Sequence, residues 1–217
     1  MAKLPKPFII VAFVLFRSAY DHLSLGRLFK ALADRWEGRN EEPLTPLERS
    51  KVRAFFIDCL IVSRLVVALG MLSIATALPT GLVFIPVAIS VLIVADVLLS
   101  HLVHMMDDSV GSAGPQARLS TQRSFVIALI NVLVLLAAYA TLFVSLSDES
   151  IARAIALSVS SVAISGVVSP EGRNAVGISL AATASGLFML TVVLSTIVAG
   201  FRQRLSLEES SKKREAD

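Results

Sequence analysis

Four long apolar stretches constrain this chain more than any other feature. A helix of roughly 20 residues crosses a hydrocarbon core of about 30 Å, so an apolar stretch of that length predicts a membrane span. The stretches are Phe55 to Leu78, Leu82 to Val103, Ser124 to Leu146, and Ala175 to Phe201. Only 17% of the residues are charged, against about 25% in soluble domains. We therefore expect an all-α integral membrane protein with four transmembrane helices.

The positions of the basic residues indicate how these spans are oriented. Ten Lys and Arg residues precede residue 54, two lie between the second and third stretches, and five follow residue 201. Between the third and fourth stretches there are only Arg153 and Arg173. Cytoplasmic segments are enriched in Lys and Arg, so both termini and the loop of residues 105–123 are expected in the cytoplasm, with the spans in the plasma (inner) membrane. Membrane orientation explains the basic pI without a nucleic-acid partner.

A fifth apolar stretch, Ile151 to Val168, is shorter and rich in Ser and Val. If it crossed the membrane, the basic C-terminal tail would lie outside, against the charge rule. We therefore expect it to enter from the outer side and return there, with a short helix from about Ile151 to Val162. Non-helical backbone at membrane depth is tolerated only inside protein or beside a water-filled cavity. This re-entrant segment is therefore the first functional candidate.

The two ends of the chain are more polar than the spans. Apolar residues at helical spacing predict an interfacial amphipathic helix on the cytoplasmic leaflet; they are Leu25, Leu28, Phe29, Leu32 and Trp36. A linker rich in Glu and Pro follows over residues 41–46. The last residues are charged and lack aromatic side chains, which predicts a solvated, frayed tail.

The residues from 124 to 201 carry a resemblance to a known family. Ser158-Val159-Ser160-Ser161-Val162 matches the first part of the signature T-x-T-T-V-G-Y-G-D, with Ser for Thr, and Pro170 and Gly172-Arg173 match the Pro and Gly-Arg that follow it. On these residues the segment resembles the pore of bacterial two-transmembrane potassium channels. The resemblance implies an outer helix, a pore helix, a filter and an inner helix, with four copies around one pore. It assigns the filter to Ser160, Ser161, Val162, Ala163, Ile164, Ser165 and Gly166.

The filter itself departs from that family. Where the family has G-Y-G-D, this chain has Ala163-Ile164-Ser165-Gly166. A stack of backbone carbonyls strips the hydration shell from potassium, and its glycines take angles that a Cβ disfavours. In that geometry Ala163 and Ser165 would have a left-handed conformational cost. We therefore predict a wider, hydroxyl-lined path and a weakly selective cation pore.

The final stretch is rich in small residues between Gly177 and Gly186. Small residues allow close approach of helices in lipid. One interpretation is an inner helix lining a pore, with Gly186 as its hinge. The other is ordinary packing within a four-helix bundle, and small residues alone do not separate the two.

The first two spans contain ionisable residues, which usually face a partner or a cavity. Arg64 and Asp96 lie at similar depths, roughly 12–15 Å from the cytoplasmic edge at 1.5 Å per residue. Neighbouring antiparallel helices would bring them together, so we predict a buried ion pair. A structural salt bridge is the simpler interpretation, and a sensor or ion path is the other.

His101, His104, Asp107 and Asp108 share one helical face at the cytoplasmic mouth of the second span. Imidazole with carboxylate can hold a transition metal, so His101, His104 and Asp107 are candidate ligands. Without a third fixed ligand, side chains that finish a helix at the interface are the simpler interpretation.

These patterns predict five segments: 1–53, interfacial helix and linker; 54–105, transmembrane hairpin; 106–123, cytoplasmic loop; 124–201, pore-like unit; and 202–217, charged tail. We expect a homotetrameric, weakly selective pore for monovalent cations, in contact with the lipid bilayer. We expect no enzymatic activity and no cofactor, because no catalytic motif is found in the sequence. The alternatives are a non-conducting membrane scaffold or accessory subunit that binds another membrane protein, and a small transporter or metal carrier using the His101 to Asp108 face.

Overall fold

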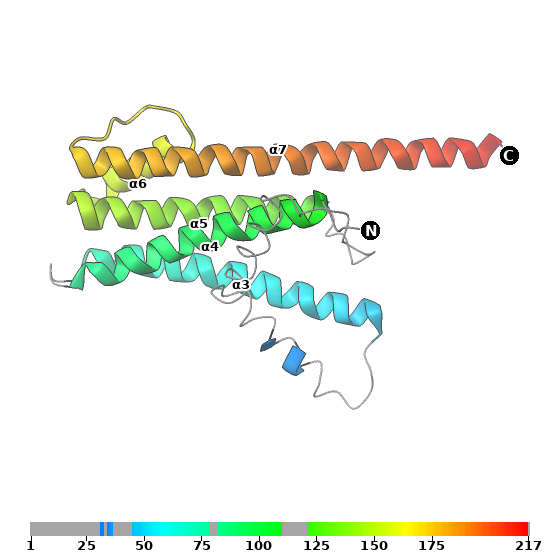
Figure 1. Cartoon of the computed structure of the whole chain (residues 1–217), viewed down its shortest axis with the longest axis horizontal. Helices are drawn as coiled ribbons and strands as arrows, with labels where there is room; N and C mark the ends of the chain where they lie inside the picture. The colour runs from blue at the N-terminus through cyan, green and yellow to red at the C-terminus, as the bar shows by residue number, and fades with distance from the viewer. Residues whose placement is uncertain (1–30, 33, 37–44, 79–81, 110–120, 217) are drawn as a thin grey trace, which may run out of the picture. The chain divides into compact units, whose positions relative to one another are not determined.

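The computed structural model describes residues 31–32, 34–36, 45–78, 82–109 and 121–216. Its longer elements are all helices: α3 (Pro46–Ala75), α4 (Phe84–Ser109), α5 (Thr121–Ser147), α6 (Ile151–Val162) and α7 (Arg173–Ala216) (Figure 1). No strand occurs in these described ranges. The expected all-α class is confirmed, and the predicted short helix has the bounds expected for it.

Four of the helices are long and apolar enough to cross a membrane. The candidate spans are Ala54–Ala75, Phe84–Leu102, Arg123–Ser147 and Arg173–Ser195. They correspond to the four apolar stretches of the sequence. The chain is therefore a multi-pass membrane protein by the length and composition of its helices.

The chain forms two compact units. The larger comprises Ile61–Leu98 with Ala117–Asp217, and the smaller comprises Met1–Leu60 with Leu99–Gln116. Helices α3 and α4 each contribute one part to each unit. The five segments expected from sequence stay a prediction.

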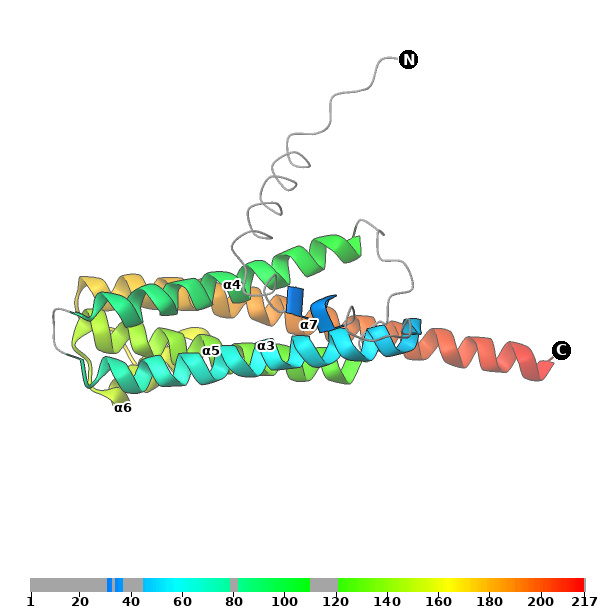
Figure 2. The ribbon, with the colours of Figure 1, turned by 90° about the horizontal axis from the view of Figure 1, so that it is seen from below.

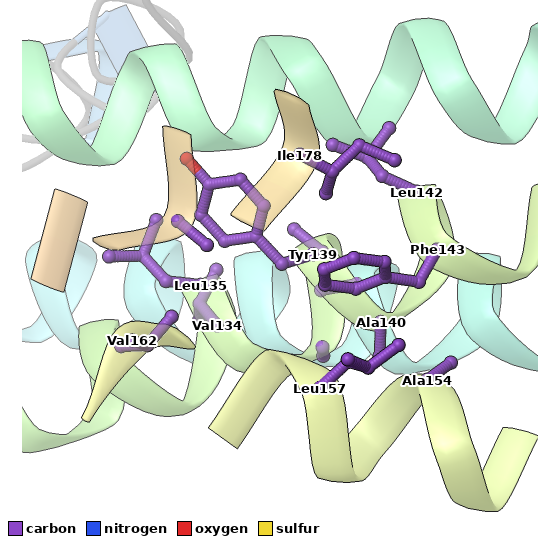
Figure 3. Packing of buried hydrophobic residues seen from close by; sticks show 14 of the residues in the cluster. Val134, Leu135, Tyr139, Ala140, Leu142, Phe143, Ala154, Leu157, Val162 and Ile178 are labelled. Atoms are coloured by element: carbon purple, nitrogen blue, oxygen red, sulfur yellow. The ribbon is translucent and has the colours of Figure 1, made fainter. Parts of the chain in front are cut away.

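Helix α5 is the centre of the larger unit. Of its span 56% is buried, against 22–33% for the other three spans. It contacts both α6 and α7, which also contact each other. Figure 3 shows Phe143 of α5 with Ala154 and Leu157 of α6 on one side and Ile178 of α7 on another. All four side chains belong to one buried cluster, so α5, α6 and α7 share a single core.

The parts of α3 and α4 in the larger unit join the same core. Ala68 of α3 and Val97 of α4 are fully buried in the cluster that contains Val134 and Leu135 of α5. Small or branched side chains at these positions let apolar helices approach closely, which drives association where lipid is as apolar as the protein.

In the smaller unit, α3 begins with a capping box. Thr45 is the residue before the helix, Pro46 is its first residue, and the Glu48 carboxylate accepts hydrogen bonds from the Thr45 N–H at 2.9 Å and hydroxyl at 2.7 Å. Both Thr45 bonds hold the pKa of Glu48 below its usual value. The box satisfies backbone donors that the first turn leaves without partners. The end of the predicted linker, Thr45 and Pro46, is therefore the start of α3.

The predicted interfacial helix falls mostly on residues that the structure does not describe. Of that region, residues 31–32 and 34–36 are described and helical. Leu32 and Trp36 are exposed, and with Arg35 and Phe56 they line a surface hollow. The rest of the predicted amphipathic helix lies outside the described residues.

The prediction of a frayed tail is wrong. Helix α7 continues to Ala216 (Figures 1 and 2). The tail is built from good helix formers (Arg, Gln, Leu, Glu and Lys), and its Glu208 and Glu209 precede Lys212 and Lys213 by four residues. These propensities and spacings stabilise a helix in water. Helices α4 and α5 likewise extend into the predicted 106–123 loop, to Ser109 and from Thr121.

Candidate functional site

The α6 helix and the segment after it form a hairpin beside α5 and α7. Helix α6 begins where α5 ends, and the chain after α6 returns to that same end before α7 begins (Figure 1). We call residues 163–172 the return segment. The start of α6 is fixed by Ser150, whose hydroxyl accepts the Arg153 N–H at 3.4 Å. Ser and Asp are favoured at this position because they supply an acceptor to the first turn.

Arg153 joins the C-terminal end of the return segment to the start of α6. Its guanidinium lies 2.7 Å from the Glu171 carboxylate and 3.1 Å from that of Glu149. The Glu171 hydrogen bond, together with the charges of Glu149 and Glu171, raises the pKa of Arg153. Arg153 is 41% exposed, so water weakens these ion pairs. They position the chain rather than contribute much stability.

Helix α6 runs far along its neighbours. The Ser158 hydroxyl donates to the Leu136 carbonyl of α5 at 2.7 Å, and Leu136 lies eleven residues before the end of α5. The Val162 carbonyl packs against Gly186, thirteen residues into α7. At 1.5 Å per residue, the end of α6 lies roughly 17–20 Å along these helices. That is near the middle of both candidate spans.

Gly186 packs against the C-terminal end of α6, a contact that the sequence did not indicate. A Cβ built at residue 186 would lie 2.0 Å from the Val162 carbonyl oxygen and 2.9 Å from its carbon. Only glycine permits this approach of α6 to α7. Helix α7 is continuous through Gly186. Its proposed flexing as a hinge stays a prediction.

The predicted filter residues gather at the C-terminal end of α6. The N–H groups of Ala163, Ile164 and Ser165 donate to the carbonyls of Val159, Ser161 and Ser160 at 2.9, 3.2 and 2.9 Å. This is the Schellman pattern of helix ends. Ala163 is right-handed helical, and positive φ angles occur at Ile164 (59°) and Gly166 (61°).

Ile164 is strained in this cap. A residue in the left-handed position after a helix is usually Gly or Asn, and a β-branched residue there is a conformational outlier. Ile164 keeps this conformation although its side chain is 45% exposed. For a carbonyl filter, the sequence predicts the left-handed conformational cost at Ala163 and Ser165. In the structure this cost lies at Ile164 instead.

A hydroxyl-lined pocket of about 240 Å³ lies beside this cap. It is lined by Ser160, Ser161, Ile164, Gly166, Val168, Ser169, Pro170, Ser179 and Thr183. The Ser161 and Ser179 hydroxyls are 2.7 Å apart and join α6 to α7. The Val168 N–H donates to the Ser160 hydroxyl at 3.1 Å and fixes the return segment. None of the lining side chains ionises, so the pocket offers neutral oxygens, which suit water and hard monovalent cations.

Tyr139 and Ser185 form a second polar link between α5 and α7. Their hydroxyls are 2.7 Å apart, and the Tyr139 hydroxyl also lies 3.1 Å from the Ala181 carbonyl. A tyrosine hydroxyl buried among apolar side chains needs such a partner. Sequence reasoning missed Tyr139, although it is the only tyrosine in the apolar stretches. A single tyrosine in an apolar stretch could have indicated a buried hydroxyl that needs a partner.

Arg64 and Asp96 form the buried ion pair expected from their depths. Nη2 of Arg64 contacts Oδ2 of Asp96, and the two side chains are 3% and 11% exposed. Asn131 of α5 is also buried, at 2% exposure. An arginine can remain charged at such depth only beside an opposite charge or other polar groups. The pair joins α3 to α4 within the larger unit.

The structure describes the side chain of only one of the three predicted metal ligands. His101 is half-buried, while the side chains of His104 and Asp107 lie outside the described residues. Among the side chains that are described, no group of three His, Cys, Asp or Glu is placed to hold a metal. The metal site of His101, His104 and Asp107 stays a prediction.

Comparison with protein-family models, curated proteins and solved structures finds no match for this chain.

Proposed function

We propose that this protein forms an oligomeric, weakly selective pore for monovalent cations. One observation carries the proposal: α6 ends near the middle of the α5 and α7 spans, beside a pocket of neutral oxygens. A helix carries partial negative charge at its C-terminal end, which stabilises a cation in a low-dielectric region. One copy provides one wall of such a path, so several copies, four by the resemblance, are needed to enclose it.

The pocket chemistry supports weak selectivity. A potassium-type filter needs free backbone carbonyls, but here the Val159, Ser160 and Ser161 carbonyls accept hydrogen bonds within the cap. The pocket instead offers serine and threonine hydroxyls to an ion, among them those of Ser169 and Thr183. A partly hydrated ion beside hydroxyls is recognised mainly by its charge. Sodium and potassium should then pass at similar rates.

The same cap supports a second candidate function. If no carbonyl stack faces the path, the unit could serve as a non-conducting scaffold or accessory subunit for another membrane protein. The occupied carbonyls of residues 159–161 favour this alternative. The hydroxyl pocket favours the pore.

Cation flux into liposomes tests the proposal. Full-length protein is reconstituted, and uptake of potassium and sodium is compared with protein-free liposomes. We expect uptake of both ions, reduced several-fold by Ser161→Ala together with Ser179→Ala. Thr191→Val is the matched control, because Thr191 is an exposed hydroxyl of α7 outside the pocket. Protein that assembles but passes neither ion would contradict the pore and support the scaffold.

We also propose that the protein lies in the plasma (inner) membrane with both termini in the cytoplasm. The support is the charge distribution: 17 basic residues lie in the segments assigned to the cytoplasm (ten, two and five), and two lie in residues 147–173. A cysteine placed at residue 215 should resist an impermeant thiol reagent in intact cells and react after lysis. Labelling in intact cells would place the tail outside.

A further inference from the structure

The return segment has little spare length on its way back to the start of α7. The Val168 N–H bonds to the Ser160 hydroxyl, and Ser160 lies two residues before Val162, whose carbonyl contacts Gly186. At 1.5 Å per residue, Val168 therefore lies roughly 16 Å from the beginning of α7 at Arg173. An extended chain covers at most about 3.3–3.6 Å per residue. Residues 168–173 must run nearly straight, which leaves almost no length for hydrogen bonds within the segment.

Three backbone donors of the return segment have no acceptor. Within the described residues, the N–H groups of Gly166, Val167 and Ser169 donate no hydrogen bond, whereas that of Val168 does. All three residues are exposed. In hydrocarbon such groups are costly, because lipid tails offer no acceptor. At this depth in the span, the segment must face water or acceptors of another protein.

Water supplies these acceptors better than a second copy of the chain would. Carbonyls inside a helical span already accept hydrogen bonds from their own helix. The large side chains exposed on the described spans are aliphatic or aromatic, with Leu92 and Leu180 among the most exposed. Such a surface would leave the same N–H groups unpaired. Exposing Ile164 and Val167 to water costs less than leaving three amide donors unpaired in apolar surroundings.

The exposed segment continues into the hydroxyl pocket. Gly166 and Ser169 line the pocket and are themselves exposed, so the pocket is open on the side of the return segment. Its volume of about 240 Å³ has room for several water molecules, which occupy about 30 Å³ each in the liquid. The hydroxyls of Ser169 and Thr183 are polar partners of the kind that retain water.

We propose that the return segment borders a water-filled vestibule, open to the outer side of the membrane and ending at the hydroxyl pocket. Its ligands are water and the hydrated ions that water carries. The N–H groups of Gly166, Val167 and Ser169 donate to this water, so the exposed backbone is satisfied well inside the span. The inference rests on the membrane placement of α6 in the proposed function and not on ion conduction.

Hydrogen exchange tests the vestibule at the backbone itself. Full-length protein in lipid nanodiscs is placed in heavy water, and mass spectrometry with fragmentation resolves the amides of residues 166–169. We expect Gly166, Val167 and Ser169 to exchange within seconds and Val168 to exchange more slowly, because its N–H is bonded to Ser160. Ser160→Ala should make Val168 as fast as its neighbours. Slow exchange of all four amides would mean that lipid or protein covers them, and would overturn the proposal.

Thiol labelling tests whether this water reaches the outer side. In a Cys59→Ser background, Val167→Cys should react with an impermeant thiosulfonate added outside intact cells. Leu92→Cys is the matched control: Leu92 is 67% exposed on α4 and lies about 12 Å from the outer end of its span, less deep than Val167. A thiol in hydrocarbon is rarely ionised, so the control should react at least about tenfold more slowly.

Both cysteine variants should react fully once the protein is denatured. Equal rates in the membrane, or reaction of Val167→Cys from the cytoplasmic side alone, would overturn the vestibule.

The vestibule and the pore can fail separately. Labelling of Val167→Cys in protein that passes no cations would support the vestibule and contradict the pore. Cation flux through protein whose Val167→Cys stays unlabelled would overturn the vestibule, because the ions would then take another path.

Discussion

Gly186 and Val162 set the distance between α6 and α7. The Val162 carbonyl occupies the space that a side chain at residue 186 would need, 2.0 Å from the position of a Cβ. The contact holds the C-terminal end of α6 against α7 near the middle of its span. The position of the hydroxyl pocket depends on it.

Gly186→Ala should therefore destabilise the protein. The obstructing atoms are backbone, so α6 or α7 must shift, and overpacking of this kind costs about 1–3 kcal/mol. Thermal unfolding in detergent would measure the loss. The matched control is Gly70→Ala in α3, where a Cβ meets nothing within 4 Å. Helix propensity alone should make that control neutral or stabilising by up to about 1 kcal/mol. Equal unfolding temperatures for both variants would contradict the contact.

The Arg64–Asp96 pair should show strong coupling. Arg64→Ala leaves the Asp96 carboxylate without its cation, and breaking a buried pair costs about 3–5 kcal/mol. Asp96→Asn should cost less in the Arg64→Ala background than alone, with a coupling of about 0.5–3 kcal/mol. A double-mutant cycle from detergent unfolding measures the coupling. Strictly additive effects would mean that the two charges do not stabilise each other.

Ile164→Gly should stabilise the isolated chain. Relief of the left-handed φ is worth about 1 kcal/mol, and the Ile164 side chain is 45% exposed, so its removal loses little packing. Unfolding of monomeric protein tests this. Val167→Gly is the control, because Val167 has no positive φ. A loss of stability in Ile164→Gly would show that the side chain packs within its own chain.

Arg153→Gln should loosen the return segment without unfolding the protein. The variant removes the charge that pairs with Glu171 and Glu149. The labelling rate of a cysteine at Ser169 should rise a few-fold, and high salt should raise it similarly in the parent, because these partly exposed ion pairs are screened. Arg173→Gln serves as the control, since Arg173 is not in any ion pair among the described residues. An unchanged rate in Arg153→Gln would mean that the ion pairs do not hold the segment.

Local sequence patterns were enough to predict the four spans and α6, but not the C-terminal part of α7. The lengths of the apolar stretches mark the spans, and the Pro170 to Arg173 turn precedes α7. The Arg64–Asp96 pair was also predictable, because a short connection forces two helices into an antiparallel hairpin and rise per residue then fixes depth.

Contacts between distant residues were not predictable in the same way. The approach of Val162 to Gly186 and the Ser161–Ser179 and Tyr139–Ser185 pairs depend on how α6 rotates between α5 and α7. The sequence shows only that the residues are small or polar. The cap at Ile164 runs against local propensity, so a rule based on propensity would place glycine there and not isoleucine. Such conflicts between local preference and structure are expected at functional sites.

Reversal potentials across planar bilayers containing the purified full-length protein test the central claim most directly. With potassium on one side and sodium on the other, the reversal potential should lie close to zero, because neutral hydroxyls recognise a partly hydrated ion mainly by its charge. A reversal potential near the potassium equilibrium value would show that the backbone of residues 161–166 forms a selective filter without the family's glycines. Absence of any current from an assembled oligomer would contradict the pore itself.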